Sequence, residues 1–139
     1  MNDYTEDALV EQPAIELFKQ LKWDAANCYD ETFPNSFLGR ATSAEVVLVA
    51  RLRAALEKLN DGLPPDAINA AIEELTRDRS TLTPVAANRD VYQLLKNGIK
   101  VSVRGDDEQE TTETVRVIDW DDHTNNDYFL ASQLWVVSL

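Results

Sequence analysis

The sequence predicts an α+β fold, in which a helix-rich N-terminal part packs on a small mixed or antiparallel sheet. Two observations lead to this prediction. Apolar residues recur every three or four positions through most of the first 98 residues, as on the buried face of a helix. After Ile99, apolar and polar residues alternate, as they do in half-buried strands. The length of 139 residues fits one domain over 1–139, large enough to bury its own core.

The first helix is expected over residues 5–22, with Thr5 as its N-cap. Pro13 lies inside this stretch and has no backbone N–H, so the helix must bend or restart there. Residues 23–41 show no helical stripe, and within them we expect residues 23–29 to be extended or to form a short strand. The expected buried stripe of the helix consists of Leu9, Gln12, Ile15, Phe18 and Leu21.

The second helix has a clear start signal and is expected over residues 42–60. Thr42 and Glu45 are spaced as a capping box, in which each side chain bonds the backbone N–H of the other residue. Two further helices are expected over residues 64–79 and 84–97, since each begins at a proline suited to a first helical turn. The expected buried face of the second helix holds Val46, Val49, Leu52, Leu56 and Leu59.

Three strands are expected in the last third of the chain, over residues 99–104, 111–119 and 128–137. The first two are joined by a polar turn and form a hairpin. The third carries apolar residues on both faces, as central strands do, and no charged residue from Tyr128 to Leu139 protects its edge. We therefore expect a homodimer through the strand from Tyr128 to Val137, unless residues 23–29 fold back and cover that edge.

The chain is strongly acidic, with 13 Lys and Arg residues against 25 Asp and Glu residues and a formal net charge of −12. This charge opposes contact with phosphate, so strong binding of DNA or RNA by the chain alone is not expected. Arg40, Arg51 and Arg53 form a modest basic cluster that would contact DNA, although pairing with the many carboxylates is the favoured interpretation. No apolar run has the length of a membrane span and no secretion signal is recognised, so a cytoplasmic protein is expected.

No catalytic site can be assembled from these residues. The chain has one cysteine, Cys28, and one histidine, His123, which excludes an internal disulfide and a zinc site of Cys and His within one chain. Cys28 lies beside Asp30 and Glu31, which disfavour a reactive thiolate. The acidic loop at residues 121–127 is interpreted as solvated rather than as a cation site, because its spacing differs from that of an EF-hand.

Six stretches of the sequence resemble the restriction (R) subunit of type I restriction–modification enzymes. The strongest is NNDYFLASQLWV at residues 125–136, and the others are residues 5–12, 27–31, 86–92, 94–98 and 115–120. They cover nearly the whole chain, in order. The resemblance implies the N-terminal region of that subunit, whose nuclease domain is of the PD-(D/E)xK type. The implied fold is therefore an incomplete restriction-endonuclease-like nuclease domain.

The resemblance also sets expectations for chemistry and partners. Such a subunit cleaves DNA with Mg²⁺, translocates DNA with ATP, and assembles with methylation and specificity subunits. The metal-binding Asp and the Glu-x-Lys pair of the family would follow the segment that matches Gln133, Leu134 and Trp135. The chain itself is therefore expected to hold no catalytic residue and no cofactor. Glu11 on the first helix is the residue that would lie near the metal.

Two functions stay open from the sequence. The first is a non-catalytic scaffold at the N-terminus of an R subunit. The second is a free-standing acidic protein that inhibits a bacterial defence complex, either as a decoy of the subunit or as a mimic of DNA. A pseudogene product without activity is a third interpretation. The even match along the chain, which includes the hairpin and the loops, favours the first.

Overall fold

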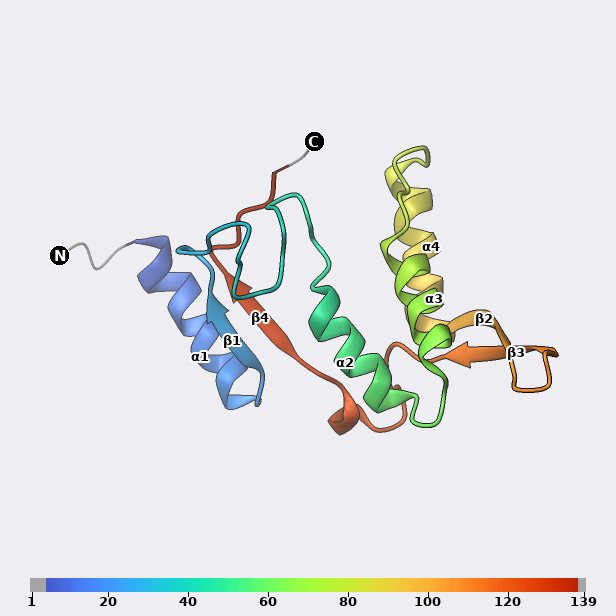
Figure 1. Ribbon diagram of the computed structural model, residues 1–139. Helices are drawn as coiled ribbons and strands as arrows, with labels where there is room; N and C mark the ends of the chain where they lie inside the picture. The colour runs from blue at the N-terminus through green and yellow to red at the C-terminus, as the bar shows by residue number, and fades with distance from the viewer. Residues whose placement is uncertain (1–4, 138–139) are drawn as a thin grey trace. The chain divides into compact units, whose positions relative to one another are not determined.

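The computed structural model describes residues 5–137 (Figure 1). These residues belong to two compact units. The first is drawn from Met1–Val46 and Asp127–Leu139, and the second is Val47–Asn126. Each unit holds at least one helix and a two-stranded sheet, so the predicted α+β class is confirmed. A single domain over 1–139 and a nuclease-like core stay predictions.

The first unit begins with a helix that contains a π turn just before its proline. A π-helical turn, η1 (Asp7–Glu11), leads into α1 (Gln12–Gln20). Pro13 follows shortly after this π turn, and Glu11 and Gln12 keep helical dihedrals, so the helix is irregular before its proline but does not stop and restart. Thr5 Oγ1 accepts a hydrogen bond from the Ala8 N–H at 3.1 Å, as expected of an N-cap. Leu9, Gln12 and Leu21 are exposed, contrary to prediction. The wider π turn shifts Leu9 off the α1 stripe, Leu21 lies past the helix end, and Gln12 Nε2 donates instead to Asp7 Oδ1 at 2.9 Å.

A parallel pair of strands forms the sheet of the first unit. β1 (Asp24–Asn27) pairs with β4 (Phe129–Ser132) in the register Asp24↔Phe129 to Asn27↔Ser132. Figure 1 shows the two strands side by side, next to α1. The Trp23 ring contacts Phe18 of α1 and Tyr128, with centroid distances of 4.8 and 5.0 Å. The extended segment expected at residues 23–29 is thus a strand that covers one edge of β4.

β4 is much shorter than the predicted strand over residues 128–137. Gln133 has a left-handed backbone with φ of 54°, which a strand residue does not adopt, so the ladder ends at Ser132. From there to Val137 the chain is irregular, and Trp135, Val136 and Val137 are exposed. The prediction of a central strand that continues to Val137 is therefore wrong.

The second unit contains three helices, α2 (Val49–Leu59), α3 (Pro65–Thr76) and α4 (Pro84–Asn97). α3 and α4 begin where their prolines predict, and Thr83 caps α4 by accepting a hydrogen bond from the Ala86 N–H at 3.2 Å. α3 ends at Thr76, three residues before the predicted end at 79. Within residues 5–137, no helix combines the length and the apolar character that a membrane span requires.

The prediction of a helix over residues 42–60 is wrong at its start, since α2 begins at Val49. Thr42 and Glu45 do not form a capping box. The Glu45 carboxylate accepts a hydrogen bond from the Ala41 N–H at 2.9 Å, and the Thr42 hydroxyl accepts one from the Ala44 N–H at 3.3 Å. These local bonds between side chains and backbone stabilise a turn, which competes with the helix.

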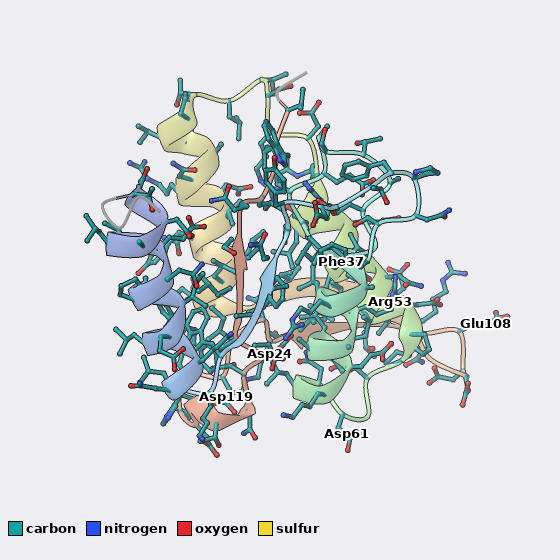
Figure 2. The ribbon with its side chains drawn as sticks, turned by 90° about the vertical axis from the view of Figure 1, so that its left-hand side faces the viewer. Asp24, Phe37, Arg53, Asp61, Glu108 and Asp119 are labelled. Atoms are coloured by element: carbon teal, nitrogen blue, oxygen red, sulfur yellow. The ribbon has the colours of Figure 1, made fainter. Side chains whose placement is uncertain are left out.

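β2 (Ile99–Arg104) and β3 (Glu110–Val115) form the predicted antiparallel hairpin, and Figure 2 shows Glu108 at the outer end of its loop. β3 ends at Val115 rather than at residue 119 because the Asn60 side chain forms hydrogen bonds with the backbone N–H and C=O of Arg116. The Arg116 N–H donates to Asn60 Oδ1 at 2.7 Å, and Asn60 Nδ2 donates to the Arg116 carbonyl at 2.8 Å. A short 3-10 turn, η2 (His123–Asn125), follows in the chain.

The core of the second unit lies where α3 packs on one face of the hairpin. Alternate residues of β2 are buried, and those between them are exposed, as the period of two predicts. Val46 and Val49 are exposed, which contradicts their predicted burial; Val46 lies outside α2 altogether. The buried cluster consists of Leu56, Ala67, Ile68, Ala71, Ile72, Ile99, Val101, Val103 and Val115.

Candidate functional site

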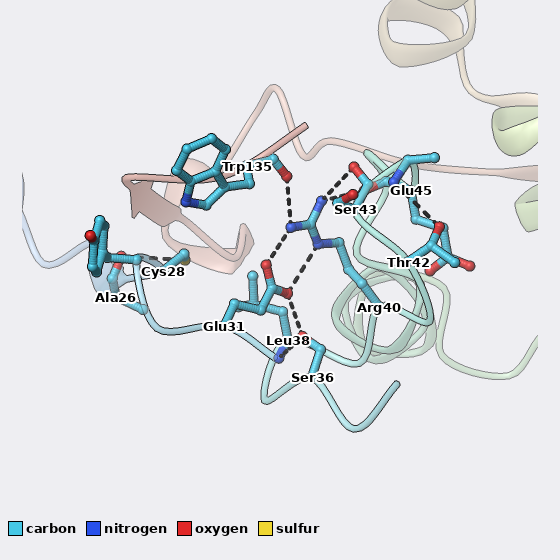
Figure 3. A network of polar contacts seen from close by, with 12 residues as sticks. Ala26, Cys28, Glu31, Ser36, Leu38, Arg40, Thr42, Ser43, Glu45 and Trp135 are labelled. Atoms are coloured by element: carbon cyan, nitrogen blue, oxygen red, sulfur yellow. Dashed lines mark hydrogen bonds and ion pairs between the residues drawn. The ribbon is translucent and has the colours of Figure 1, made fainter. Parts of the chain in front are cut away.

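Arg40, one of the three predicted DNA contacts, is buried in the first unit (Figure 3). Its Nε and Nη2 donate to the Glu31 carboxylate, the former at 3.1 Å. Its Nη1 donates to the carbonyls of Glu45 at 2.8 Å and Ser43 at 3.4 Å, and its Nη2 also donates to the carbonyl of Trp135 at 3.0 Å. The guanidinium therefore joins the loop after β1 to the chain segment that follows β4.

This burial argues against a contact between Arg40 and a DNA phosphate. The five bonds use all five N–H donors that a guanidinium has. The hydrogen bond from Arg40 holds the pKa of Glu31 below its ordinary value, so the pair stays ionised. Cys28 is also buried nearby, and burial followed by the charge of Glu31 raises the pKa of its thiol, which agrees with the inert thiol expected from the sequence.

Arg51 and Arg53 lie on α2 in the second unit, and both are half-buried. Arg53 Nη1 donates a hydrogen bond to Asn69 Oδ1 at 2.7 Å, which joins α2 to α3. Arg40 belongs to the other unit. The three arginines are therefore divided between the two units, and contact of Arg51 and Arg53 with DNA stays a prediction.

Glu11, the predicted metal-site residue, forms hydrogen bonds with Gln133, which lies 122 positions later in the sequence. Gln133 Nε2 donates to both carboxylate oxygens of Glu11, each at 2.8 Å. Glu11 ends the π turn before α1, and Gln133 directly follows β4. Because β1 and β4 are parallel, this contact lies at the carboxyl end of the pair, the end at which open α/β sheets bind their ligands.

A small cavity lies beside this contact, between α1 and the β1–β4 pair. Its volume is about 140 Å³. The polar groups that line it come from Gln12 and Lys19 of α1 and from Asn27 and Ser132 at the ends of the two strands. The sequence did not predict that Gln133 and these polar residues lie together, because their proximity depends on the parallel pairing of two distant segments.

The donors at this end of the sheet do not make a complete magnesium site. Mg²⁺ favours six oxygen ligands in octahedral geometry, usually from one or two carboxylates together with water or substrate phosphates. Among residues 5–137, no group of three or more His, Cys, Asp or Glu side chains is placed to hold a metal ion. Glu11 therefore contributes a single carboxylate, held by an amide.

Asp119 and Asn126 organise the acidic loop of the second unit. Asp119 Oδ1 accepts hydrogen bonds from the N–H groups of Asp121 and Asp122, both at 3.0 Å, and Asn125 Nδ2 donates to Asp119 Oδ2 at 3.0 Å. These bonds, that of Asn125 above all, lower the pKa of Asp119 to about 2. The carboxylate of Asp119 is therefore occupied by hydrogen bonds within its own loop.

Comparison with known proteins gives one family and one relative. The family described as "Type I restriction enzyme R protein N terminus" matches residues 3–138. The "Type I restriction enzyme HindI endonuclease subunit" of Haemophilus influenzae is 30% identical over 130 residues, which are 93% of this chain and 12% of that protein. No solved structure matches the chain.

Proposed function

The chain belongs to the family of type I restriction enzyme R protein N termini, and we propose that it is a non-catalytic scaffold within the nuclease part of such a subunit. The name of the relative describes an endonuclease subunit, and the chain spans 12% of its length. In this proposal the chain positions side chains that support DNA cleavage by the whole subunit. The observation that carries the proposal is the contact between Glu11 and Gln133.

This contact supports a scaffold role because it orients a carboxylate without neutralising it. Gln133 is an uncharged donor, so the contact brings no positive charge to the Glu11 carboxylate. Metal-assisted phosphodiester cleavage needs several positioned carboxylates. In this proposal Glu11 supplies one of them, and the remaining ligands come from parts of the subunit outside residues 5–137.

The same proposal covers cofactors, partners and location. Membership in the family implies the context of a multisubunit complex. Within it we infer that Mg²⁺ serves DNA cleavage and ATP serves DNA translocation, both bound by other parts of the subunit. DNA and the methylation and specificity subunits are the proposed partners, and the cytoplasm, where such an enzyme meets foreign DNA, is the proposed location.

Two cleavage assays test the scaffold role. The purified chain, incubated with plasmid and Mg²⁺ or Mn²⁺, should nick no more DNA than buffer does. In an R subunit that carries this segment, Glu11→Gln should lower DNA cleavage by at least about tenfold, since one charged ligand is lost. Glu16→Gln, a change at an exposed position of α1, is the matched control and should cleave normally.

Either of two results would contradict the scaffold proposal. The first is nicking by the purified chain that disappears in Glu11→Ala. The second is equal cleavage by the Glu11→Gln and Glu16→Gln subunits. ATP-driven translocation by the same subunits is the internal check, because a misfolded variant would lose translocation as well.

An inhibitor of a defence complex is the alternative function, and the net charge of −12 favours it. A decoy or a DNA mimic would block an intact type I restriction enzyme when added in roughly stoichiometric amount. Under the scaffold proposal, the added chain leaves cleavage unchanged. Restriction of a plasmid by the intact enzyme, titrated with the chain, separates the two functions.

A homodimer through residues 128–137 is a further proposal about partners, although the strand in this range ends at Ser132 and the competing expectation, that residues 23–29 cover its edge, is met on one side. β1 covers one edge of β4, and the exposed Trp135, Val136 and Val137 would supply the apolar part of the contact. Light scattering of the wild-type chain and of Val136→Lys tests it. A dimer that dissociates in the variant supports the proposal, and a monomer in both forms at high concentration contradicts it.

A further inference from the structure

The outer edge of β2 presents backbone groups that the hairpin does not use. The Gly105 N–H donates to the Gln109 carbonyl at 3.0 Å, which marks a hydrogen-bonded pair. Such pairs alternate along an antiparallel ladder, so Ile99, Val101 and Val103 bond to β3. The N–H and C=O groups of the intervening residues, Lys100, Ser102 and Arg104, point away from β3. Within residues 5–137, no backbone hydrogen bond is made to them on that side.

An open groove adjoins the first part of this edge, at residues 98–101. Its volume is about 490 Å³, and it lies between β2 and the helices α3 and α4. Ala70, Leu94, Ile99 and Val101 supply its apolar surface. Its polar lining comes from Glu74, Lys100, Gln93 and Asn97, of which the last two are bonded to each other at 2.9 Å. A strand added beside β2 would place alternate side chains on the same face as Ile99 and Val101, toward this groove.

The exposed face of the edge is basic in an otherwise acidic chain. Lys100 and Arg104 flank Ser102 on that face, and all three are exposed. Arg104 lies 3.9 Å from Glu110 across the hairpin, in a pair that is exposed on both sides. An added strand with acidic side chains on this face would pair with Lys100 and Arg104 across the new ladder.

The same charges disfavour pairing with a second copy. In an antiparallel β2–β2 pair centred on Ser102, Lys100 of each copy lies opposite Arg104 of the other. Like charges directly opposite each other destabilise a sheet, and lysine on an edge strand is a common protection against self-pairing. The edge therefore selects an acidic partner over its own copy.

We propose that the outer edge of β2, from Lys100 to Arg104, binds an extended segment of another protein in which apolar and acidic residues alternate. The bound segment adds a third strand to the β2–β3 sheet, a known mode of peptide recognition. Its apolar side chains enter the groove beside α3 and α4, and its acidic side chains face Lys100 and Arg104. This proposal is independent of the nuclease scaffold.

Proline substitutions test the edge directly. The probe is a fluorescent peptide of alternating Val and Glu, about seven residues long. Ser102→Pro removes an N–H that β3 does not use, so the hairpin tolerates it, and peptide affinity should fall at least about tenfold. Thr112→Pro removes the equivalent N–H on the outer edge of β3 and is the matched control, with affinity within about twofold of wild type.

Charge reversal gives a second test that does not depend on proline. The double change Lys100→Glu and Arg104→Glu should lower the affinity for the Val–Glu peptide at least about tenfold. It should raise the affinity for a Val–Lys peptide of the same length. Amide chemical shifts of the wild-type chain should change most from Lys100 to Arg104. Circular dichroism of each variant checks that it folds.

Any of four results would overturn the proposal. The first is that the wild-type chain shows no saturable peptide binding, and the second is that Ser102→Pro and Thr112→Pro lose peptide affinity equally. The third is that the amide chemical-shift changes centre on β3. The fourth is that the same amides respond to self-association or to DNA instead. If Ser102→Pro alone fails to fold, the charge reversal decides.

Discussion

Replacing Arg40 by methionine should destabilise the first unit strongly. The side chains of Arg40 and Glu31 are each 1% exposed, so the change leaves a buried carboxylate without its partner. Breaking a buried ion pair in this way costs about 3–5 kcal/mol. Three backbone carbonyls, those of Ser43, Glu45 and Trp135, also lose a donor. The loss is large against the roughly 5–15 kcal/mol of stability of a typical domain.

Urea unfolding followed by tryptophan fluorescence measures this loss. Trp23 and Trp135 lie in the first unit, and Trp120 lies in the second. Arg53→Met is the matched control, because Arg53 is only half-buried and its bond to Asn69 is worth about 1 kcal/mol. The double change Arg40→Met and Glu31→Met should recover part of the loss, since no buried charge remains.

The pH dependence of the same variant provides a second check. In the wild type the pKa of Glu31 is lowered, so its contribution to stability is present above its unfolded pKa and is lost as the pH falls. In Arg40→Met the buried, unpaired carboxylate has a raised pKa instead, so the variant should gain stability as the pH falls toward about 4. A loss below about 1 kcal/mol, or additive losses in the double variant, would refute the reasoning.

Three further predictions concern the second unit and the whole chain. The pKa of Asp119, about 2 against an ordinary 3.8, means that its contribution is present above about pH 4 and disappears between pH 4 and 2; Asp119→Asn should flatten this part of the acid-unfolding curve, read from Trp120 fluorescence. Gly98→Ala should cost more than about 1 kcal/mol in urea unfolding, because Gly98 has φ of 80° and a new Cβ would lie 2.8 Å from Thr114 Cγ2; an unchanged midpoint would contradict this. Moderate salt should raise the melting temperature, since the net charge of −12 repels itself, and a melting temperature that falls with salt would show that attractive pairs dominate.

The sequence predicted the elements whose signals are local. α4 begins at its capping Thr83 and α3 at Pro65, because a cap and a proline act within one turn. The hairpin follows from the alternation after Ile99, since each strand buries one face. Glu11 was singled out from the family resemblance; its role at a metal stays a prediction, and the structure adds only its contact with Gln133.

Only the tertiary structure decided where several elements end and what the charged residues do. Asn60 ends β3 by bonding the backbone of Arg116, 56 positions away, and no local pattern carries that information. The sequence around Arg40 does not show whether its guanidinium binds a phosphate or a carboxylate. Arg40 pairs with Glu31 because the fold removes both from water, where an unpaired charge is far costlier than a paired one. Contacts between distant segments therefore set the partners of polar groups, while local periodicity sets the elements that carry them.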